Sequence, residues 1–400
     1  MREYDVMIAG HLCLDVIPQF PDNGQRDIAS IMRPGKLVNV NSAKISTGGP
    51  VSNTGLNLKK LGLNVCFCSC VGDDKFGKMA IEILGENGNA DGISIRQDCT
   101  SSYTIVVAPP GIDRIFLHNP GTNDLFTSED LDVEMIRKSR HFHFGYPPLM
   151  KEMFSRGGEE LVKIFRIAKE AGATTSCDMT LPDPASDSGK APWRDILEKL
   201  MPYVDIYVPS IEETFYMLYP DEFLEMKAAH DNAELIDFIS ADKYTSIADE
   251  ILNMGAGMVT LKSGHRGFYI RTGSVDRIQR FGAGKPSDVS NWAERQLWVP
   301  AYKVENLASA TGSGDSSIAG LLAGFIRGLS IEQSLKYAVC LGYQNVQVLD
   351  AVSGIKDWQQ TTELINSDMP VIDVNMDSEG WLFDNEYNVW ENKCAVSVKE

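Results

Sequence analysis

Short apolar strands that alternate with helices dominate the middle of this chain. The predicted strands are 141–145, 174–178, 204–208 and 257–262, and the predicted helices are 159–171, 196–201, 211–218 and 248–253. A strand–helix–strand connection returns to the same sheet as a parallel strand, because its right-handed crossover places the helix on a sheet face. The alternation therefore predicts an α/β fold with a doubly wound, mostly parallel sheet.

Two β-rich stretches stand outside this alternation. Residues 103–108 and 114–118 flank a Pro-Pro-Gly turn and so predict a β-hairpin. Short alternating segments also occupy the region before residue 45. We expect the stretches at about 12–45 and 93–123 to form a small β-rich lid on the α/β body.

The last part of the chain differs from the rest in composition. Residues 367–400 are acidic, yet they carry the aromatic residues Trp381, Phe383, Tyr387 and Trp390. Large aromatic rings favour burial, so we expect them to pack onto the body. The chain is therefore divided into one domain over residues 1–366 and an acidic aromatic C-terminal extension over 367–400.

The charge balance restricts the partners of this protein. The chain has 37 basic and 55 acidic residues, a formal net charge of −18. Such a charge opposes binding to nucleic acid and to anionic membranes, so we expect neither as a partner. No apolar run approaches the roughly 20 residues of a membrane span, and Val6 to Ala9 is too short for the core of a signal peptide. We therefore expect a cytoplasmic protein.

Three of the eight cysteines form a row. Cys66, Cys68 and Cys70 alternate along a predicted strand and so share one of its faces. A metal needs ligands that converge on one point, usually from loops. The row therefore predicts core packing instead of a metal site.

A turn of small residues between a strand and a helix, Ala310 to Asp315, carries the strongest chemical signal. Gly312, Ser313 and Gly314 precede an apolar helical pattern, so their N–H groups lie at the positive end of a helix. Such a terminus suits a phosphate or a developing anion. Asp315 then stands where a general base for a hydroxyl nucleophile would belong. A plain helix cap is the alternative that this hexapeptide leaves open.

A second glycine turn lies early in the chain. Gly48 and Gly49 lead into a helix that carries Asn53 one turn further on. Asp15 follows the first strand and can accept hydrogen bonds from hydroxyl groups. Carboxylate and amide groups together are how a polar pocket selects polyols. Taken singly, the two glycines could form an ordinary turn, and Asp15 could be a surface residue.

Taken together, these motifs resemble the ribokinase-like (PfkB) family of carbohydrate kinases from about Tyr4 to Trp358. The stretch 310–315 is similar to the family's D-T-x-G-A-G-D signature, and Gly48 to Asn53 with 71–77 is similar to its first signature. The stretch 114–123 looks like the lid-returning strand, and 260–267 looks like the nucleotide-side strand and loop. The resemblance implies a ribokinase-like kinase domain over residues 1–366.

The resemblance also implies ATP, Mg²⁺ and a division of roles. Asp315 would take the proton of a sugar hydroxyl, and the amides of Gly312, Ser313 and Gly314 would form the anion hole. The residues implied to hold the sugar are Asp15, Gly48, Gly49 and Asn53. The residues implied to lie near ATP are Lys262, Gly264, Gly267, Ser210 and Thr311, with Glu213 at the metal.

Two positions depart from the family's pattern. Ser210 stands where the family's Asn-x-x-Glu has Asn, so we expect rearranged Mg²⁺ handling. Ser309 replaces the leading Asp of the late signature, which in ribokinase itself helps to bind a monovalent cation. Dependence on a monovalent cation such as K⁺ is therefore left open.

The leading hypothesis is an ATP-dependent sugar kinase of class EC 2.7.1.-, and two alternatives accompany it. One is a nucleoside kinase, which would need an apolar slot for the base. The other is a catalytically weak, kinase-like sugar-binding sensor, suggested by Ser210 and Ser309. His118 is interpreted as structural, with a substrate contact as its alternative, and His141 and His143 as packing or surface residues. The family resemblance further suggests a homodimer through the β lid.

Overall fold

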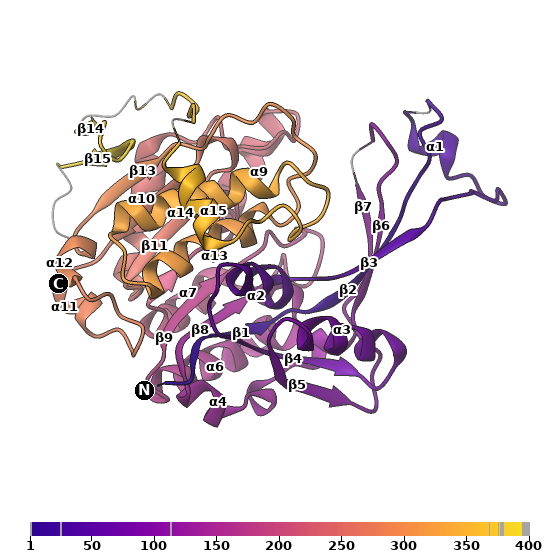
Figure 1. Cartoon of the computed structure of the whole chain (residues 1–400), viewed down its shortest axis with the longest axis horizontal. Helices are drawn as coiled ribbons and strands as arrows, with labels where there is room; N and C mark the ends of the chain where they lie inside the picture. The colour runs from indigo at the N-terminus through magenta and orange to yellow at the C-terminus, as the bar shows by residue number, and fades with distance from the viewer. Residues whose placement is uncertain are drawn as a thin grey trace.

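A large twisted sheet runs through the protein and carries helices on both faces (Figure 1). The computed structural model describes residues 2–24, 26–112, 114–367, 369–374, 376 and 380–393. Within them the largest sheet has 11 strands in the order β14-β15-β13-β12-β11-β10-β9-β8-β1-β4-β5. The strands are β1 (Tyr4–Gly10), β4 (Val65–Gly72), β5 (Asn89–Arg96), β8 (Ser139–Gly145), β9 (Thr174–Asp178), β10 (Ile206–Tyr207), β11 (Met258–Lys262), β12 (Phe268–Thr272), β13 (Gln296–Val299), β14 (Trp381–Asp384) and β15 (Val389–Asn392).

The doubly wound arrangement predicted from the sequence is confirmed. Every neighbouring pair from β11 through β5 is parallel. The central strand β1 is buried on both faces: Val6 and Ile8 enter one hydrophobic cluster, while Met7 and Ala9 enter the other. A helical layer on each face is what such a strand requires, because successive side chains point to opposite faces.

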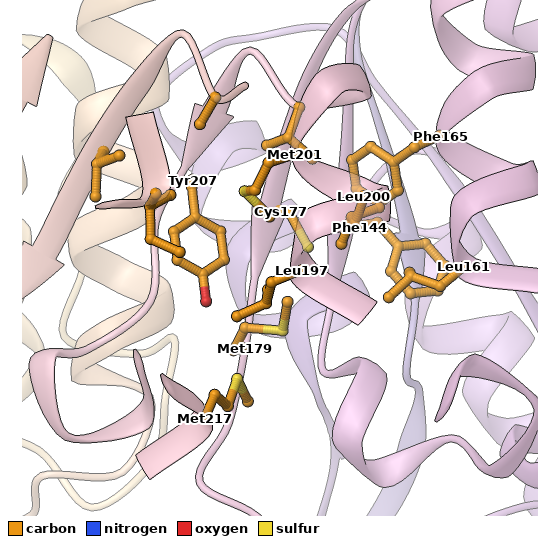
Figure 2. Packing of buried hydrophobic residues seen from close by; sticks show 14 of the residues in the cluster. Phe144, Leu161, Phe165, Cys177, Met179, Leu197, Leu200, Met201, Tyr207 and Met217 are labelled. Carbon is orange, nitrogen blue, oxygen red and sulfur yellow. The ribbon is translucent and has the colours of Figure 1, made fainter. Parts of the chain in front are cut away.

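The helices divide between these two clusters. One face is covered by α4 (Val133–Arg137), α5 (Lys151–Phe154), α6 (Glu159–Glu170), α7 (Trp193–Leu200), α8 (Ile211–Leu218), α9 (Pro220–Ala229) and α10 (Ala241–Met254). The other is covered by α2 (Pro50–Lys60), α3 (Lys75–Gly85), α11 (Val275–Gln279), α12 (Val289–Trp292), α13 (Ser313–Ile326), α14 (Ile331–Asn345) and α15 (Trp358–Ile365). Figure 2 shows the first cluster, where the rings of Phe144 and Phe165 pack edge to face with centroids 6.1 Å apart.

Single-turn helices complete the main body. They are η1 (Gly121–Leu125), η2 (Ser128–Asp130), η3 (Pro147–Leu149), η4 (Ser155–Gly158), η5 (Met201–Tyr203) and η6 (Gly264–Arg266).

A second, four-stranded sheet projects from one side of the body as the lid (Figure 1). Its order is β3-β2-β6-β7, from β2 (Cys13–Pro18), β3 (Ala43–Gly48), β6 (Tyr103–Val107) and β7 (Ile115–Asn119), with α1 (Ile28–Ile31) between β2 and β3. The hairpin expected around residues 109–111 is present as the antiparallel β6–β7 pair. The strand β5, which reaches residue 96, pairs with β4 in the large sheet.

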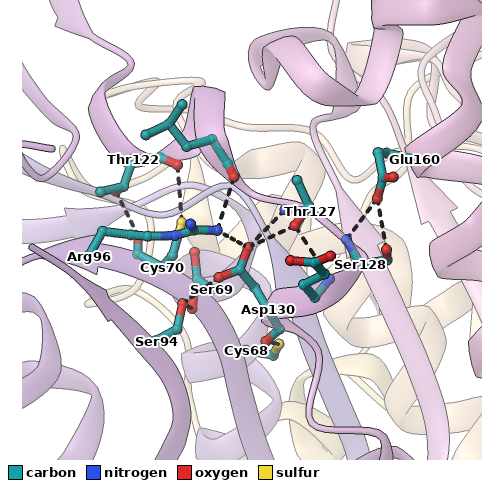
Figure 3. Close-up of polar contacts among 12 residues, drawn as sticks. Cys68, Ser69, Cys70, Ser94, Arg96, Thr122, Thr127, Ser128, Asp130 and Glu160 are labelled. Atoms are coloured by element: carbon teal, nitrogen blue, oxygen red, sulfur yellow. Dashed lines mark hydrogen bonds and ion pairs between the residues drawn. The ribbon is translucent and has the colours of Figure 1, made fainter. Parts of the chain in front are cut away.

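Polar side chains fix the base of the lid. Asn123 makes two hydrogen bonds with the backbone of Leu12. Its Oδ1 accepts from the Leu12 N–H at 3.2 Å, and its Nδ2 donates to the Leu12 carbonyl at 3.0 Å. Figure 3 shows the neighbouring contacts, in which Arg96 pairs with Asp130 at 2.7 Å and Thr122 donates to the Cys70 carbonyl at 2.8 Å. The strands that leave and re-enter the body are therefore held together at one point.

The C-terminal extension continues the large sheet. Strand β15 pairs antiparallel with β13, placing Trp390 opposite Trp298, and β14 pairs with β15. Trp381 is buried in the first hydrophobic cluster, and Phe383 packs on Trp390 with ring centroids 5.1 Å apart. The predicted packing of these aromatic residues onto the body is thus observed.

Two smaller expectations can also be compared with the structure. Cys66, Cys68 and Cys70 are buried in the first cluster, and across the described ranges no cluster of His, Cys, Asp and Glu side chains could hold a metal ion. In the same residues no helix is both long enough and apolar enough to cross a bilayer.

Candidate active site

The site forms where the strand order of the large sheet reverses. Strand β1 lies between β8 and β4, so the chain winds away from it in both directions. In open α/β sheets the crevice outside the carboxyl ends of the strands at such a switch point is the usual ligand site. His11 directly follows β1 and Tyr146 directly follows β8, so both residues stand at this crevice.

Asp315 lies at the centre of the site, in the first turn of α13. Its side chain is buried and its two carboxylate oxygens accept hydrogen bonds from three residues. Oδ2 accepts from Asn53 Nδ2 and from the Tyr146 hydroxyl, each at 2.9 Å, and Oδ1 accepts from Thr54 Oγ1 at 3.2 Å. The predicted base and the predicted sugar-side Asn53 are therefore in direct contact.

The surroundings of Asp315 make it a stronger base than an exposed carboxylate. Burial raises the pKa of Asp315, and the hydrogen bonds from Asn53, Tyr146 and Thr54 together with the charge of Lys262 oppose that rise. Burial and the negative charge of Asp315 in turn raise the pKa of Tyr146 well above 10, so this hydroxyl remains a donor. The carboxylate is thus held in place and kept ready to accept a proton.

The glycine turn before α13 has the geometry of an anion site. Gly312 has a φ of 74°, and a Cβ there would lie 2.3 Å from the Ala351 Cβ, so the turn requires glycine. The Ser313 N–H, predicted to belong to the anion hole, instead donates to the Ala310 carbonyl at 3.2 Å. The first helical bond runs from Ser316 N to Gly312 O, so Gly314 and Asp315 contribute amides that precede it.

A largely buried lysine lies beside this turn. Lys262, the last residue of β11, pairs with Asp178 at 2.6 Å, and a Cβ on Gly314 would lie 3.6 Å from its Nζ. Burial opposes the charge of Lys262, but the carboxylates of Asp178, Glu213 and Asp315 raise its pKa. Lys262 is therefore a fixed cation next to the amides of the first turn.

Ser210 and Glu213 form the N-terminal cap of α8. Glu213 accepts from the Ser210 N–H at 2.6 Å, and Ser210 Oγ accepts from the Glu213 N–H at 3.3 Å. An isolated parallel bridge joins Ser210 to Lys262, which brings this cap to the site. The Ser that replaces the family's Asn is thus engaged in capping the helix.

The donor set near Lys262 fits Mg²⁺ bound through water and phosphate. Asp178, Glu213 and Asp315 supply only carboxylate oxygens, the ligand type that Mg²⁺ prefers. No cage of three such ligands exists among the residues that the structure describes. Mg²⁺ usually keeps several waters and takes one or two carboxylates, so the set suits that mode of binding.

The predicted sugar-side residues meet at the junction of body and lid. Gly48 packs so closely on Asp15 that a Cβ on it would lie 2.4 Å from Asp15 Oδ2. Across the lid sheet, Asp15 is paired with Ser46 on one side and Thr104 on the other, and Thr104 is paired with His118. Paired residues share a face, so Asp15 belongs to a polar row on one face of the lid.

Two glycines that were predicted to lie near ATP shape the backbone of the turn after β11. Gly264 and Gly267 have φ values of 47° and 102° in the turn between β11 and β12. A Cβ on Gly267 would lie 2.0 Å from the Val299 carbonyl oxygen, so glycine at this position lets the turn pack against the end of β13. Thr311 donates its N–H to Ser309 Oγ at 3.0 Å.

Several site residues were not predicted from the sequence. Thr54, Tyr146 and Asp178 contact the predicted residues directly. Tyr146 and Asp178 stand at the carboxyl ends of β8 and β9, where ligands of open α/β sheets bind. Tyr146 also adopts a left-handed φ of 63°, which is uncommon for a residue with a side chain. Polar residues directly at the ends of predicted strands are therefore the sequence signal that could have pointed to Tyr146 and Asp178.

Comparison with known proteins identifies the family. A sequence profile described as "pfkB family carbohydrate kinase" matches residues 5–358. The chain belongs to this family. The family resemblance seen in the glycine turns is thereby confirmed over most of the chain.

Plant fructokinases are among the similar proteins. The probable fructokinase-4 of Arabidopsis thaliana is 28% identical over 195 residues, covering 47% of this chain and 59% of that protein. The fructokinase of Solanum tuberosum is 33% identical over 137 residues, covering 34% of this chain and 42% of that protein. The match thus spans less than two thirds of the length of these relatives.

Solved structures of the same fold cover nearly the whole chain. Arabidopsis thaliana ribokinase complexed with ribose and ATP superposes with a TM-score of 0.66 at 16% identity, covering 91% of this chain and 99% of that one. A putative ribokinase II from E. coli in complex with ATP and Mg²⁺ gives 0.65 at 21% identity, covering 90% and 99%. These likenesses establish a ribokinase-like fold for this PfkB protein.

Proposed function

We propose that this protein transfers the γ-phosphoryl group of ATP to a hydroxyl of a small, unphosphorylated sugar. The observation that carries the proposal is the buried carboxylate of Asp315, fixed by Asn53, Tyr146 and Thr54 at the N-terminus of α13. A carboxylate held in this way beside free helix amides and a lysine suits hydroxyl deprotonation next to a phosphoryl group.

The residues divide the reaction between them. Asp315 accepts the proton of the sugar hydroxyl while that oxygen bonds to the γ-phosphorus and the bond to the ADP oxygen breaks. The amides at Gly312, Gly314 and Asp315, together with Lys262, stabilise the negative charge on the transferred group. Asp15 and Asn53 orient the sugar from the lid side and the body side.

Mg²⁺ would neutralise phosphate charge when bound. The carboxylates near Lys262, above all Glu213, would hold it through water molecules. Gly264, Gly267, Thr311 and Ser210 would line the nucleotide side. These assignments extend the likeness to the E. coli protein that was solved with ATP and Mg²⁺.

D-fructose is our first candidate for the sugar. The similar plant proteins are named fructokinases, and a solved protein of the same fold carries ribose with ATP. The polar row around Asp15 favours hydroxyl groups over the flat base of a nucleoside, which would need an apolar slot. A nucleoside kinase and a weakly active sugar sensor are the alternatives.

Arg114 contacts Ser309, the position at which the family's signature has an aspartate. Its guanidinium donates to Ser309 Oγ at 2.8 Å, two residues before Thr311. A cation of the protein thus lies against the position at which ribokinase has an acid. We infer that the activity does not depend on K⁺.

A homodimer through the lid is part of this proposal. Strand β7 is an edge strand, and its residues Ile115, Phe116 and Leu117 are 41%, 52% and 51% exposed. Exposed apolar side chains on an unpaired strand edge are a common place for association. We also propose that residues 1–366 form the kinase domain, with a lid from about 12–45 and 97–123, because residues 93–96 belong to the large sheet. The extension 367–400 contributes β14 and β15 to that sheet.

A coupled ATPase assay tests the function. The full chain is supplied with ATP and Mg²⁺, with D-fructose, D-ribose, D-glucose or adenosine as acceptor, and with or without K⁺. Sugar-dependent ADP formation that K⁺ does not change is expected. Turnover with adenosine alone would favour the nucleoside kinase. Sugars that raise the melting temperature without any turnover would favour the sensor.

A further inference from the structure

Three of the buried polar atoms that lack a hydrogen-bond partner within the described residues belong to His11 and Asn53, at the sugar side of the active site. His11 is 3% exposed, yet neither of its ring nitrogens has a partner within the described residues. The same holds for Asn53 Oδ1, although Asn53 Nδ2 is bound to Asp315. Buried polar side chains normally find partners inside the protein, so an exception of this kind needs an explanation.

The position of His11 is set by the backbone around it. Its N–H donates to the Gly145 carbonyl at 3.2 Å, and its carbonyl accepts from the Val51 N–H at 3.4 Å. These bonds join the end of β1 to the end of β8 and to the start of α2. The backbone of His11 is therefore fixed at the switch point of the sheet.

Three parts of the site surround the imidazole ring. The His118 ring of lid strand β7 lies 5.4 Å away between centroids, and the Tyr146 ring lies 6.1 Å away. A Cβ on Gly49 would lie 2.6 Å from His11 Nδ1, so only glycine at that position fits against the ring. The ring thus stands between the lid, the glycine turn and the tyrosine that holds Asp315.

The other buried histidines behave differently. His141 Nε2 and His143 Nδ1 each share a hydrogen bond of 2.7 Å with Ser176 Oγ, beneath the helical layers. Each of them therefore has one internal partner, as a structural histidine does. His11 has none, and it lies at the ligand crevice instead of the core.

We propose that His11 is a sugar-binding residue, whose imidazole donates one hydrogen bond to the substrate and accepts another from it. The inference rests on the proposed function, because it assigns a partner for His11 within that site. The site then offers the sugar hydroxyl groups one donor, which is one nitrogen of His11. It also offers three acceptors: the other His11 nitrogen, Asn53 Oδ1 and the Asp15 carboxylate.

The charge state of His11 narrows the substrate class. Burial and the nearby His118 lower the pKa of His11 to about 3, so the ring is neutral at physiological pH. A neutral ring offers a hydroxyl group one donor and one acceptor, whereas a phosphate is bound best by cations. This part of the site therefore fits the hydroxyl groups of an unphosphorylated sugar.

The unpartnered ring also predicts an unusual stability effect. Replacing a hydrogen-bonded buried side chain by an apolar one leaves a partner unsatisfied, but the His11 ring has no hydrogen-bond partner to lose among the described residues. His11→Phe and His11→Leu should therefore melt at or above the wild-type temperature while they bind sugar less tightly. Such a trade between stability and function marks a residue that is kept for its ligand.

The test measures D-fructose binding by calorimetry without ATP, together with kcat and KM in the coupled assay. His11→Phe should weaken binding at least tenfold and raise KM accordingly, with kcat within about threefold of wild type, because the base is untouched. His11→Asn or His11→Gln, which keep a donor and an acceptor, should restore part of the affinity. His141→Asn is the matched buried control and should leave KM unchanged.

Monodeoxy analogues of D-fructose separate a direct contact from a loss of shape. The wild type should reject at least one analogue, and His11→Phe should bind that analogue and D-fructose alike. An unchanged dissociation constant in His11→Phe, or a lower melting temperature with unaltered selectivity, would overturn the role of His11. Absence of turnover by the wild type with any sugar would instead contradict the proposed function.

Discussion

At the scale of single residues, the site consists of a carboxylate and the donors that hold it. Asp315 is reached by Asn53 and Thr54 from α2 and by Tyr146 from the end of β8. Each donor stabilises the charged carboxylate and so lowers its pKa, against the effect of burial. The balance between these effects determines how strong a base Asp315 is.

Removing the tyrosine hydroxyl should shift the pH dependence of the reaction. In Tyr146→Phe the carboxylate loses a hydrogen bond to its charged form, so the pKa of Asp315 rises. Because the base must be deprotonated, the acid limb of the kcat/KM profile should move to higher pH, and kcat should fall about tenfold. Tyr387→Phe, on the C-terminal hairpin, is the control. An acid limb that stays in place would mean that another group titrates.

At the scale of elements, the lid depends on contacts at its base and at its far side. Asn123 binds both the N–H and the carbonyl of Leu12, where the chain leaves the body. Lys44 of β3 pairs with Asp350, and Arg114 reaches Ser309, so the lid also contacts the loops around α13. The lid, which comes from the first third of the chain, is thus also held by segments from late in the chain.

Loosening the base of the lid should reduce stability and sugar affinity together. Asn123→Ala leaves two buried backbone groups of Leu12 unpaired, which should lower the free energy of unfolding by about 2 kcal/mol or more. KM for the sugar should rise, since Asp15 and His118 lie on the lid strands. Urea denaturation and steady-state kinetics measure the two effects. Asn87→Ala, at an exposed helix end, should change neither, and a fully stable Asn123→Ala would contradict this view of the lid.

The sequence was most informative where a function depends on consecutive residues. The turn at Gly312 and the glycine–proline start of α2 were recognisable, because left-handed glycine and proline at the first helical position are local requirements. Tyr146, Asp178 and His11 were missed, because their proximity to Asp315 follows from the order of strands β9, β8 and β1. Strand order depends on packing between distant segments, which no local pattern contains.

At the scale of the whole molecule, one sheet edge is covered by a further hairpin and another is exposed. The edge of the large sheet at β13 is covered by the C-terminal hairpin, where Trp390 lies opposite Trp298. Among the residues that the structure describes, no further strand pairs with the lid edge at β7, which carries exposed apolar side chains. A second copy of the chain is the partner that we propose for it.

A charge on that edge should separate the copies. Phe116→Lys places an ammonium group on the exposed strand, so a dimer formed there should dissociate into monomers, as measured by light scattering after size-exclusion chromatography. Leu382→Lys is the matched control, because Leu382 is also exposed, at 59%, but lies on β14. A wild type that is monomeric at every concentration, or a dimer that survives Phe116→Lys, would rule out the lid interface.

The central claim is that Asp315 takes the proton from a sugar hydroxyl. It is tested most directly by comparing kcat and sugar binding in Asp315→Asn and wild type, with Asp288→Asn, at the cap of α12, as the control. Asparagine keeps the size of the side chain and most of its contacts but cannot accept the proton. We expect kcat to fall by about 10²-fold or more while sugar binding changes little. Undiminished turnover in Asp315→Asn would contradict the claim.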